Sequence, residues 1–421
     1  MTTKKNTLAE ELTYRGLVNQ HTGESIDEIT SKERTLYLGI DPTGDSLHVG
    51  NLLILMAVRR FYEHGHKIII LVGGATATIG DPSGKTEERV LMDEKTVEEN
   101  ANKIRKQIQS VINTEDFKLV DNNDWLSKVS ILEFLRDTGK YFTVNDMLRK
   151  ESVKRRIEDP ESSISFTEFA YMLLQAHDFS VLNEKYGCDL QVGGSDQWGN
   201  IVTGVELIRK KKQTEAHAFT IPLLLDKSTG RKFGKSEKGA VWLDAKKTSP
   251  FHFYQFWYNT EDESAREYLK YYTTLEESEI EKINKDSEAS PEMRIAQTAL
   301  AYEVTAIVHG KETAEKIKNI SVALYSGDFK KLTHSEKEVL LSSVPSYKMV
   351  DEKGISIIDL LTETELATSK REARTFVESG AVTLRGEKID DVEKLIKKGD
   401  VKDAITILKK GKRDIMLLYK D

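Results

Sequence analysis

The residues of this sequence that are best placed to do chemistry lie between positions 37 and 51, a stretch that reads YLGIDPTGDSLHVGN. Thr43 and His48 can donate hydrogen bonds to phosphate oxygens, and Gly50 lets the backbone approach a ligand closely. A helical pattern begins at Asn51, and the N-terminus of a helix favours anions. The alternative is an ordinary loop with a turn at Asp-Pro-Thr-Gly and a histidine that merely caps the helix. This stretch alone supports both interpretations equally.

A second stretch, at 232–236, reads KFGKS and follows Arg231. It places three cations and the hydroxyl of Ser236 around Gly234. Such a group can hold a polyphosphate. Taken by itself, a solvated basic loop is the better interpretation.

The elements around these stretches predict an α/β fold. Residues 35–40 form an apolar run, a helical pattern follows from Asn51, and residues 67–74 form a second apolar run rich in β-branched side chains. A run of this kind is typical of a parallel strand buried on both faces. The unit is therefore β-loop-α-β, and ligands of open α/β sheets bind at the carboxyl ends of the strands.

A similar unit comes later in the chain. A strand at 189–192 leads through Gly193 and Gly194 into a helix from about 198 to 211. Asp196 can accept hydrogen bonds from ribose hydroxyls, and the glycines let a base or sugar lie against the backbone. The alternative is a tight turn in which Asp196 is the helix N-cap.

Together these stretches resemble the two signatures of class I aminoacyl-tRNA synthetases. HVGN at 48–51, here called the first signature, stands for one, and KFGKS at 232–236, the second signature, for the other. Four more segments narrow the resemblance to the bacterial type of tyrosyl-tRNA synthetase: YLGIDPT at 37–43, GDPSGK at 80–85, FTEFAYMLLQAHD at 166–178 and LQVGGSDQWGN at 190–200. The resemblance covers nearly the whole chain.

This resemblance implies a reaction in two steps. The carboxylate of L-tyrosine attacks the α-phosphorus of ATP, giving tyrosyl-adenylate and pyrophosphate, and tyrosine then passes to the 3′-terminal ribose of tRNA(Tyr). A carboxylate is already an adequate nucleophile, so the protein mainly stabilises negative charge on the leaving pyrophosphate. Mg²⁺ comes with ATP, and no metal site built from protein ligands is expected.

The resemblance also assigns residues to each task. The catalytic residues are Thr43, His48, Lys232, Lys235 and Ser236, with Lys85 nearby. The tyrosine site comprises Tyr37, Gly39, Asp81, Tyr171, Gln175, Asp178 and Gln191, with Tyr37 and Asp178 around the phenol hydroxyl and Asp81, Tyr171 and Gln175 around the ammonium group. The ATP site comprises Asp41, His48, Gly50, Asn51, Gly193, Asp196 and Lys235. The tRNA contacts are Lys154, Arg209, Lys210, Lys370, Arg371 and Arg374.

The signatures depart from the family pattern at two places. Asn51 stands where the first signature has a histidine, and Phe233 and Gly234 replace Met-Ser in the second. We expect altered kinetic constants from these changes, with function retained.

Other functions were weighed against this one. The rivals are a tryptophanyl-tRNA synthetase or another nucleotidyl transferase of the same fold, and an RNA-binding or splicing factor descended from a synthetase. A P-loop at residues 80–86 is disfavoured, because three residues separate its glycines where that motif needs four.

The predicted fold is a Rossmann-like doubly wound parallel sheet with a helical insertion, followed by an all-helical domain and a small α+β RNA-binding domain of the alpha-L type. The expected boundaries are a catalytic domain at 1–226, an insertion at about 85–186, the loop of the second signature at 227–247, a helical domain at 248–327, a linker at 328–350 and the alpha-L domain at 351–421. The insertion is expected to be mostly helical, with one short strand near 117–120. The resemblance implies that the insertion forms a homodimer interface and that the domain at 248–327 binds the anticodon arm; the sequence by itself supports almost equally an insertion that packs on its own domain.

Composition favours a soluble cytoplasmic protein. The 421 residues carry a net charge of −7, and the single cysteine, Cys188, suits a reducing compartment. The chain has no apolar run of membrane-spanning length, and its first residues do not resemble a signal peptide. From Lys370 to Asp421 there are 14 basic against 10 acidic residues, which suggests a nucleic-acid-facing end.

Overall fold

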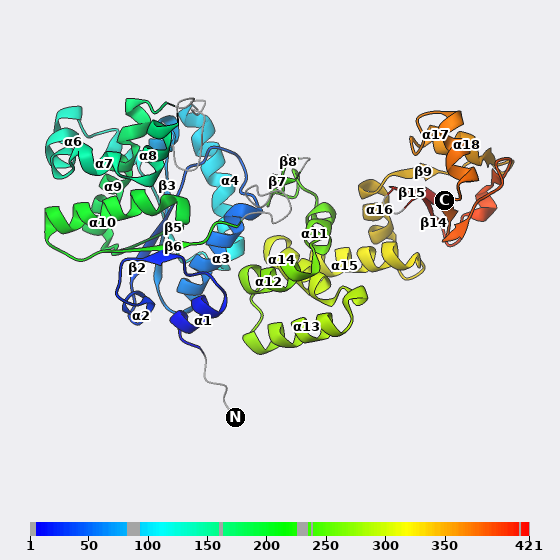
Figure 1. Cartoon of the computed structure of the whole chain (residues 1–421), viewed down its shortest axis with the longest axis horizontal. Coiled ribbons are helices and arrows are strands. Elements are labelled where there is room, and N and C mark those ends of the chain that lie inside the picture. The colour runs from blue at the N-terminus through cyan, green and yellow to red at the C-terminus, as the bar shows by residue number, and fades with distance from the viewer. Residues whose placement is uncertain are drawn as a thin grey trace. The chain divides into compact units, whose positions relative to one another are not determined.

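The computed structural model describes residues 6–81, 93–159, 163–224, 235–236, 239–411 and 414–420 (Figure 1). They belong to two compact units, one of residues 1–248 and 261–296, the other of residues 249–260 and 297–421. The helices that we expected to form one domain at 248–327 therefore divide between the units. The first unit holds α12 (Asp262–Tyr272) and α13 (Glu277–Ala289), and the second holds α11 (Pro250–Tyr258) and α15 (Lys311–Ser326).

A six-stranded sheet organises the first unit, with the strand order β1-β6-β5-β2-β3-β4. All neighbours pair in parallel except β1, which is antiparallel to β6. The strands are β1 (Gln20–His21), β2 (Thr35–Ile40), β3 (Lys67–Val72), β4 (Lys118–Asp121), β5 (Leu190–Gly194) and β6 (His217–Ile221). Strand order reverses between β2 and β5, which confirms the predicted doubly wound sheet.

Helices cover both faces of this sheet. The crossovers that contain α3 (Val49–Glu63) and α10 (Trp198–Lys212) leave the centre of the sheet in opposite directions, so these helices lie on opposite faces. Figure 1 shows the strands between α3 and α4 (Glu94–Ile112) on one side and α9 (Phe166–Tyr186) and α10 on the other. In the described part of the chain, no helix is long and apolar enough to span a membrane.

The segment at 85–186 was expected to be mostly helical with one short strand near 117–120; the structure confirms a strand there, β4, and it belongs to the main sheet. Strand β4 pairs in parallel with β3, with Leu119 opposite Ile70 and Val120 opposite Leu71. The side chains of Leu119 and Val120 are half-buried, so β4 adds apolar side chains at this edge of the sheet. The helices between β4 and α9 are α5 (Asn123–Leu126), α6 (Ile131–Asp137), α7 (Val144–Leu148) and α8 (Glu151–Glu158).

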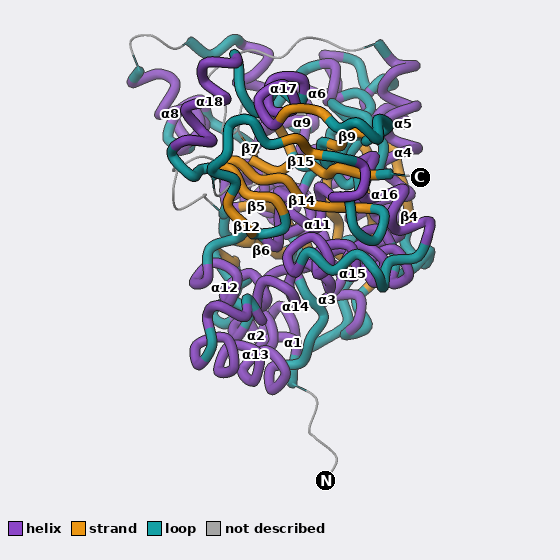
Figure 2. Tube along the Cα trace, turned by 90° about the vertical axis from the view of Figure 1, so that its right-hand side faces the viewer, coloured by secondary structure: helices purple, strands orange, loops and turns teal. Residues whose placement is uncertain are grey.

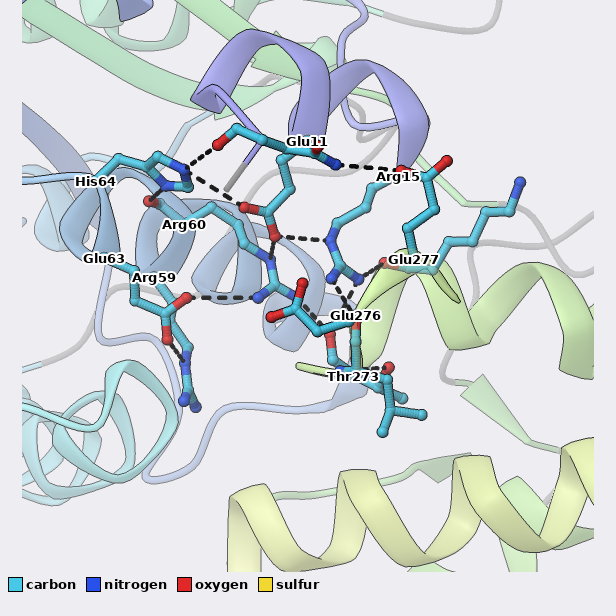
Figure 3. Close-up of polar contacts among 12 residues, drawn as sticks. Glu11, Arg15, Arg59, Arg60, Glu63, His64, Thr273, Glu276 and Glu277 are labelled. Atoms are coloured by element: carbon cyan, nitrogen blue, oxygen red, sulfur yellow. Dashed lines mark hydrogen bonds and ion pairs between the residues drawn. The ribbon is translucent and has the colours of Figure 1, made fainter. Parts of the chain in front are cut away.

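Two buried arginines join the N-terminal helix to the far end of the first unit (Figure 3). Arg15 follows α1 (Leu8–Tyr14), and Arg60 lies in the last turn of α3; both pair with Glu11. The Arg15 guanidinium donates to three backbone carbonyls at and beyond the end of α12, those of Lys270, Thr273 and Leu275. Arg60 also donates to the Thr273 carbonyl, and burial lowers the pKa of Arg60 to about 10. Figure 2 shows α1, α12 and α13 together below the strands of the sheet.

The second unit ends in a five-stranded sheet of order β12-β11-β14-β15-β9. We expected a linker at 328–350, but this segment contains α16 (His334–Ser343) and β9 (Ser346–Lys348), and β9 pairs in parallel with β15. The apolar Met349 is buried in the core of this unit, which explains why the segment is ordered there. The remaining elements are α14 (Ile295–His309), α17 (Ile357–Glu363), α18 (Lys370–Glu378), β10 (Ile355–Ser356), β11 (Val382–Leu384), β12 (Glu387–Lys388), β13 (Leu395–Ile396), β14 (Ile405–Lys410) and β15 (Asp414–Tyr419), and α2 (Ile26–Thr30) belongs to the first unit.

Candidate active site

A cavity of about 570 Å³ lies at the carboxyl ends of β2 and β5, where the strand order reverses. Ligands of doubly wound sheets bind at this point. Apart from Lys85 and the residues of the second signature, those predicted to act in catalysis or to bind tyrosine or ATP line it: Tyr37, Gly39, Asp41, Thr43, His48, Gly50, Asn51, Asp81, Tyr171, Gln175, Asp178, Gln191, Gly193 and Asp196. The structure therefore brings these residues together around one cavity.

The deepest polar groups of the cavity are Tyr37 on β2 and Asp178 on α9. Tyr37 is fully buried, and its hydroxyl finds no hydrogen-bond partner among the described residues. Burial and the nearby Asp178 raise the pKa of Tyr37 well above its usual value. Burial also raises the pKa of Asp178 to about 7. A buried hydroxyl without a partner is costly, so this end of the cavity is suited to a ligand with a polar group.

Two residues that sequence reasoning missed hold Asp178 in place. Asn122 donates from its amide nitrogen to one carboxylate oxygen at 3.0 Å, and the indole N–H of Trp125 donates to the other at 2.7 Å. The Asn122 amide also contacts Thr76 and accepts from the backbone N–H of Ala75. The carboxylate therefore has a fixed orientation.

A polar network connects Asp81 with α9 and α10. Asp81 accepts hydrogen bonds from the amides of Gln197 at 2.6 Å and Asn200 at 3.5 Å. The Asn200 amide also donates to the side-chain oxygen of Gln175 at 3.2 Å. Asp81 and Gln175, which were predicted to bind the ammonium group of tyrosine, thus share one network. Gln197 and Asn200 were missed, although both lie in the quoted segment 190–200.

Tyr171 and Asp41 form a second pair on the wall of the cavity. The Tyr171 hydroxyl donates to Asp41 at 3.1 Å, and the other oxygen of Asp41 accepts from Thr76 at 3.1 Å. Burial and the charge of Asp41 raise the pKa of Tyr171 well above its usual value. Asp41, which was predicted to bind ATP, is thus in direct contact with a residue predicted to bind tyrosine.

Gly193 and Gly194, the last two residues of β5, give the cavity a backbone wall. A Cβ atom on Gly193 would lie 2.7 Å from the end of the Ile201 side chain, so a larger residue would require Ile201 to shift. Gln191 on β5 is buried, and its side-chain oxygen has no partner among the described residues. The N-cap position of α10 is Gln197, so the alternative in which Asp196 caps this helix is not what the structure shows.

In the first signature, His48 caps α3. Its Nδ1 accepts from the backbone N–H of Gly50 at 3.0 Å, and its own backbone N–H donates to the side-chain oxygen of Asn51 at 3.1 Å. The structure thus shows the cap, and phosphate binding by His48 stays a prediction. Thr43, also on this side of the cavity, is exposed.

The second signature is only partly described. Lys232 and Lys85 lie outside the described residues. Lys235 and Ser236 form the short strand β7, which pairs with β8 (Gly239–Ala240). The predicted contacts of their side chains stay predictions.

The predicted RNA-binding residues lie on two units. Lys154 on α8 and Arg209 and Lys210 at the end of α10 are exposed in the first unit. Lys210 pairs with Glu206 at 2.7 Å, and Lys154 with Glu158 at 3.8 Å. In the second unit, three exposed cations lie on α18: Lys370, Arg371 and Arg374.

One group among the described side chains has the spacing of metal ligands, and it lies away from the cavity. It consists of Glu28, Glu215 and His217. His217 begins β6, whereas the cavity is at the opposite end of that strand. The cavity carboxylates Asp41, Asp81 and Asp178 all accept hydrogen bonds from protein groups.

Comparison with known families gives two matches that together cover most of the chain. Residues 30–326 match the family model described as tRNA synthetases class I (W and Y). Residues 336–418 match the model of the tyrosine–tRNA ligase SYY-like C-terminal domain.

Relatives and solved structures agree with these matches. The chain is 49% identical to a tyrosine–tRNA ligase of Staphylococcus haemolyticus, over 99% of this chain and 100% of the relative. A C-terminally truncated mitochondrial tyrosyl-tRNA synthetase of Aspergillus nidulans superposes with a TM-score of 0.68 at 33% identity, covering 76% of this chain and 95% of that one. A tryptophanyl-tRNA synthetase of Encephalitozoon cuniculi shares the fold, with a TM-score of 0.54 at 14% identity over 74% of this chain and 89% of that one.

Proposed function

Since this chain belongs to the class I aminoacyl-tRNA synthetases of the tyrosyl kind, we propose that its cavity binds tyrosine at the buried end and ATP at the first signature. The chain is a tyrosine–tRNA ligase. It activates L-tyrosine with ATP to tyrosyl-adenylate and pyrophosphate, and then transfers tyrosine to the 3′-terminal ribose of tRNA(Tyr).

The observation that carries the assignment of the cavity is the polar pair Tyr37 and Asp178. A phenol hydroxyl can donate to the Asp178 carboxylate and accept from the Tyr37 hydroxyl, which has no partner among the described residues. Phenylalanine would leave the Tyr37 hydroxyl buried and unpaired and would offer no donor to the Asp178 carboxylate. Tyrosyl-tRNA synthetases are the known example of such selection, with discrimination of roughly 10⁵ against phenylalanine and no editing.

The same placement of the phenol group determines where the ammonium and carboxylate groups of tyrosine lie. Asp81, Tyr171 and Gln175 line the cavity together and offer a carboxylate, a hydroxyl and an amide oxygen. A cation is favoured beside these acceptors. With the phenol and ammonium groups held, the tyrosine carboxylate is directed towards the first signature, where the ATP phosphates are expected.

Activation requires stabilisation of the leaving pyrophosphate, because no nucleophile has to be generated. We assign this to Thr43 and His48 and, in the second signature, to Lys232, Lys235 and Ser236. The N-terminus of α3 adds the positive end of the helix dipole. Mg²⁺ is expected to accompany the ATP phosphates, as the family implies. Three of the aspartates that line the cavity, Asp41, Asp81 and Asp178, already accept hydrogen bonds from protein groups.

Two further assignments concern partners. We propose a homodimer through the helices between β4 and α9, because several large apolar side chains there are exposed, among them Ile131, Leu132 and Val144, as is Phe166 at the start of α9. Sedimentation at low and high concentration tests this.

We also assign tRNA contacts to Lys154, Arg209 and Lys210 and to Lys370, Arg371 and Arg374. We further assign a cytoplasmic location to the chain.

The deciding experiment is amino-acid-dependent exchange of pyrophosphate into ATP, with tyrosine, phenylalanine or tryptophan. We expect exchange with tyrosine alone, and its loss in Asp178→Ala. A second variant, Tyr37→Phe, removes the other polar group of the pair and should also lower exchange with tyrosine. Its matched control is Tyr254→Phe, because Tyr254 is a buried tyrosine of the second unit. Exchange with tryptophan would favour the tryptophanyl rival, and no exchange from folded protein that binds RNA would favour the RNA-binding rival.

A further inference from the structure

The chain just after the second signature is bound to the chain just before α3. His48 and Trp242 form an antiparallel bridge. Around it, the N–H of Val49 donates to the carbonyl of Val241 at 3.0 Å, and the N–H of Leu243 donates to the carbonyl of Leu47 at 2.8 Å. The first signature thus shares a short ladder with residues 241–243.

Three side chains beside this ladder, those of Asp45, Trp242 and Lys247, are linked through Lys247, and we call them the clamp. Asp45 forms ion pairs with Lys247 and, at 3.3 Å, with Lys103 of α4. The Lys247 ammonium lies 4.8 Å from the centre of the Trp242 ring, within cation–π range. The Trp242 and His48 rings meet in an edge-type arrangement, with ring centres 6.2 Å apart. One lysine therefore bridges a residue before the first signature and a residue after the second.

The local turn explains how Lys247 reaches this position. The N–H groups of Lys247 and Thr248 donate to the carbonyl of Asp244, and the Thr248 hydroxyl accepts from the N–H of Trp242. The N–H of Asp244 in turn donates to the Ser46 hydroxyl at 3.2 Å. Residues 244–248 are thereby folded back onto Trp242.

The position of the clamp in the chain connects it to the reaction. Strand β7, Lys235–Ser236, pairs with β8, and β8 is followed directly by Val241 of the ladder. The backbone that carries Lys235 is thus joined, over a few residues, to the backbone that carries His48.

We propose that Asp45, Trp242 and Lys247 are positioning residues for the activation step, which hold the segment of the second signature in register with the first. They do not contact the tyrosine end of the cavity, so they act on ATP and on the leaving pyrophosphate. This inference rests on the proposed function. Because Asp45 and Lys247 are about one-third exposed, their ion pair adds little to overall stability.

The test is tyrosine-dependent pyrophosphate exchange by Lys247→Met, with Lys103→Met as the matched control. Both variants remove a lysine from Asp45, but only Lys247 also contacts Trp242. For Lys247→Met we expect kcat/KM for ATP to fall about fivefold, as for loss of an ion pair with a cation–π contact. The KM for tyrosine and the melting temperature should stay at parental values, Lys247→Arg should restore activity, and Lys103→Met should be near parental.

Three results would overturn the inference. They are parental ATP kinetics in Lys247→Met, an equal loss in Lys103→Met, and a loss shared by tyrosine and ATP together with a lower melting temperature. If the parental protein itself shows no exchange with tyrosine, the proposed function fails, and this inference fails with it. The parental control thus separates the two cases.

Discussion

The two ends of the cavity are built in different ways. At the tyrosine end the polar groups are buried and held by other side chains, as Asp178 is by Asn122 and Trp125. At the ATP end, Thr43 is exposed, and His48 is held through a helix cap and a backbone bridge. Selection of a small ligand calls for pre-oriented, desolvated partners, whereas stabilisation of a leaving polyphosphate can use backbone N–H groups and cations near solvent.

If this contrast holds, removing His48 should affect catalysis and leave tyrosine binding intact. We expect His48→Ala to lower kcat for exchange about 100-fold, as for loss of one oxyanion donor, with an unchanged KM for tyrosine. His48→Asn is the control, because asparagine is a good N-cap and keeps the stability of α3. Recovery of activity in His48→Asn would show that the histidine serves only as a cap.

Removing a side chain that holds Asp178 should instead weaken tyrosine binding and change kcat less. Asn122→Ala removes one of the two described donors to Asp178, and a hydrogen bond to a charged group is worth about 1.5–3 kcal/mol. We expect the KM for tyrosine to rise about tenfold or more, with a smaller change in kcat. Steady-state exchange with varied tyrosine measures this. A drop in kcat at constant KM would contradict the separation of the two ends.

The buried Asp178 should also make stability depend on pH. Its pKa of about 7 in the folded protein lies above its usual value of 3.8, so the folded state holds the proton more tightly. This stabilisation is complete at low pH and is lost as the pH rises through about 7. Between pH 6 and 8 we expect a loss of about 1 kcal/mol, or about 2–4 °C in melting temperature. Thermal melts without tyrosine should show this fall in the parental protein and a flatter profile in Asp178→Asn.

The smallest effect is expected at Asn51, where the first signature departs from the family pattern. Asn51→Ala removes the side-chain oxygen that accepts from the His48 N–H, which should cost about 0.5–1 kcal/mol of stability. Exchange should fall only about two- to fivefold. Asn51→Asp keeps the accepting oxygen but places a negative charge near the phosphates. We therefore expect it to be stable and less active, and parental activity would contradict phosphate binding at this helix end.

Much of the first unit was predictable because its signals are local. Each parallel strand is an apolar run next to its own loop and helix, and Tyr37 and Asp178 lie in motifs that resemble the family. Asn122 and Trp125 were missed because their link to Asp178 spans 56 and 53 residues and exists only in the folded chain. A signal was present, since the polar run Asp-Asn-Asn-Asp at 121–124 follows a strand at the ligand-binding edge. Likewise, nothing local in residues 346–348 indicates their pairing with β15.

The contacts of Arg15 and Arg60 with the end of α12 bear on how the chain folds during its synthesis. Arg15 is made early, but its carbonyl acceptors lie 255 to 260 residues later. At ribosomal rates of about 5–20 residues per second, about 13 to 50 s pass before these acceptors emerge. All six strands of the main sheet precede them in the chain. The sheet can therefore assemble on the ribosome while the N-terminal helix still awaits its last contacts, and the docking of α12 completes the catalytic unit.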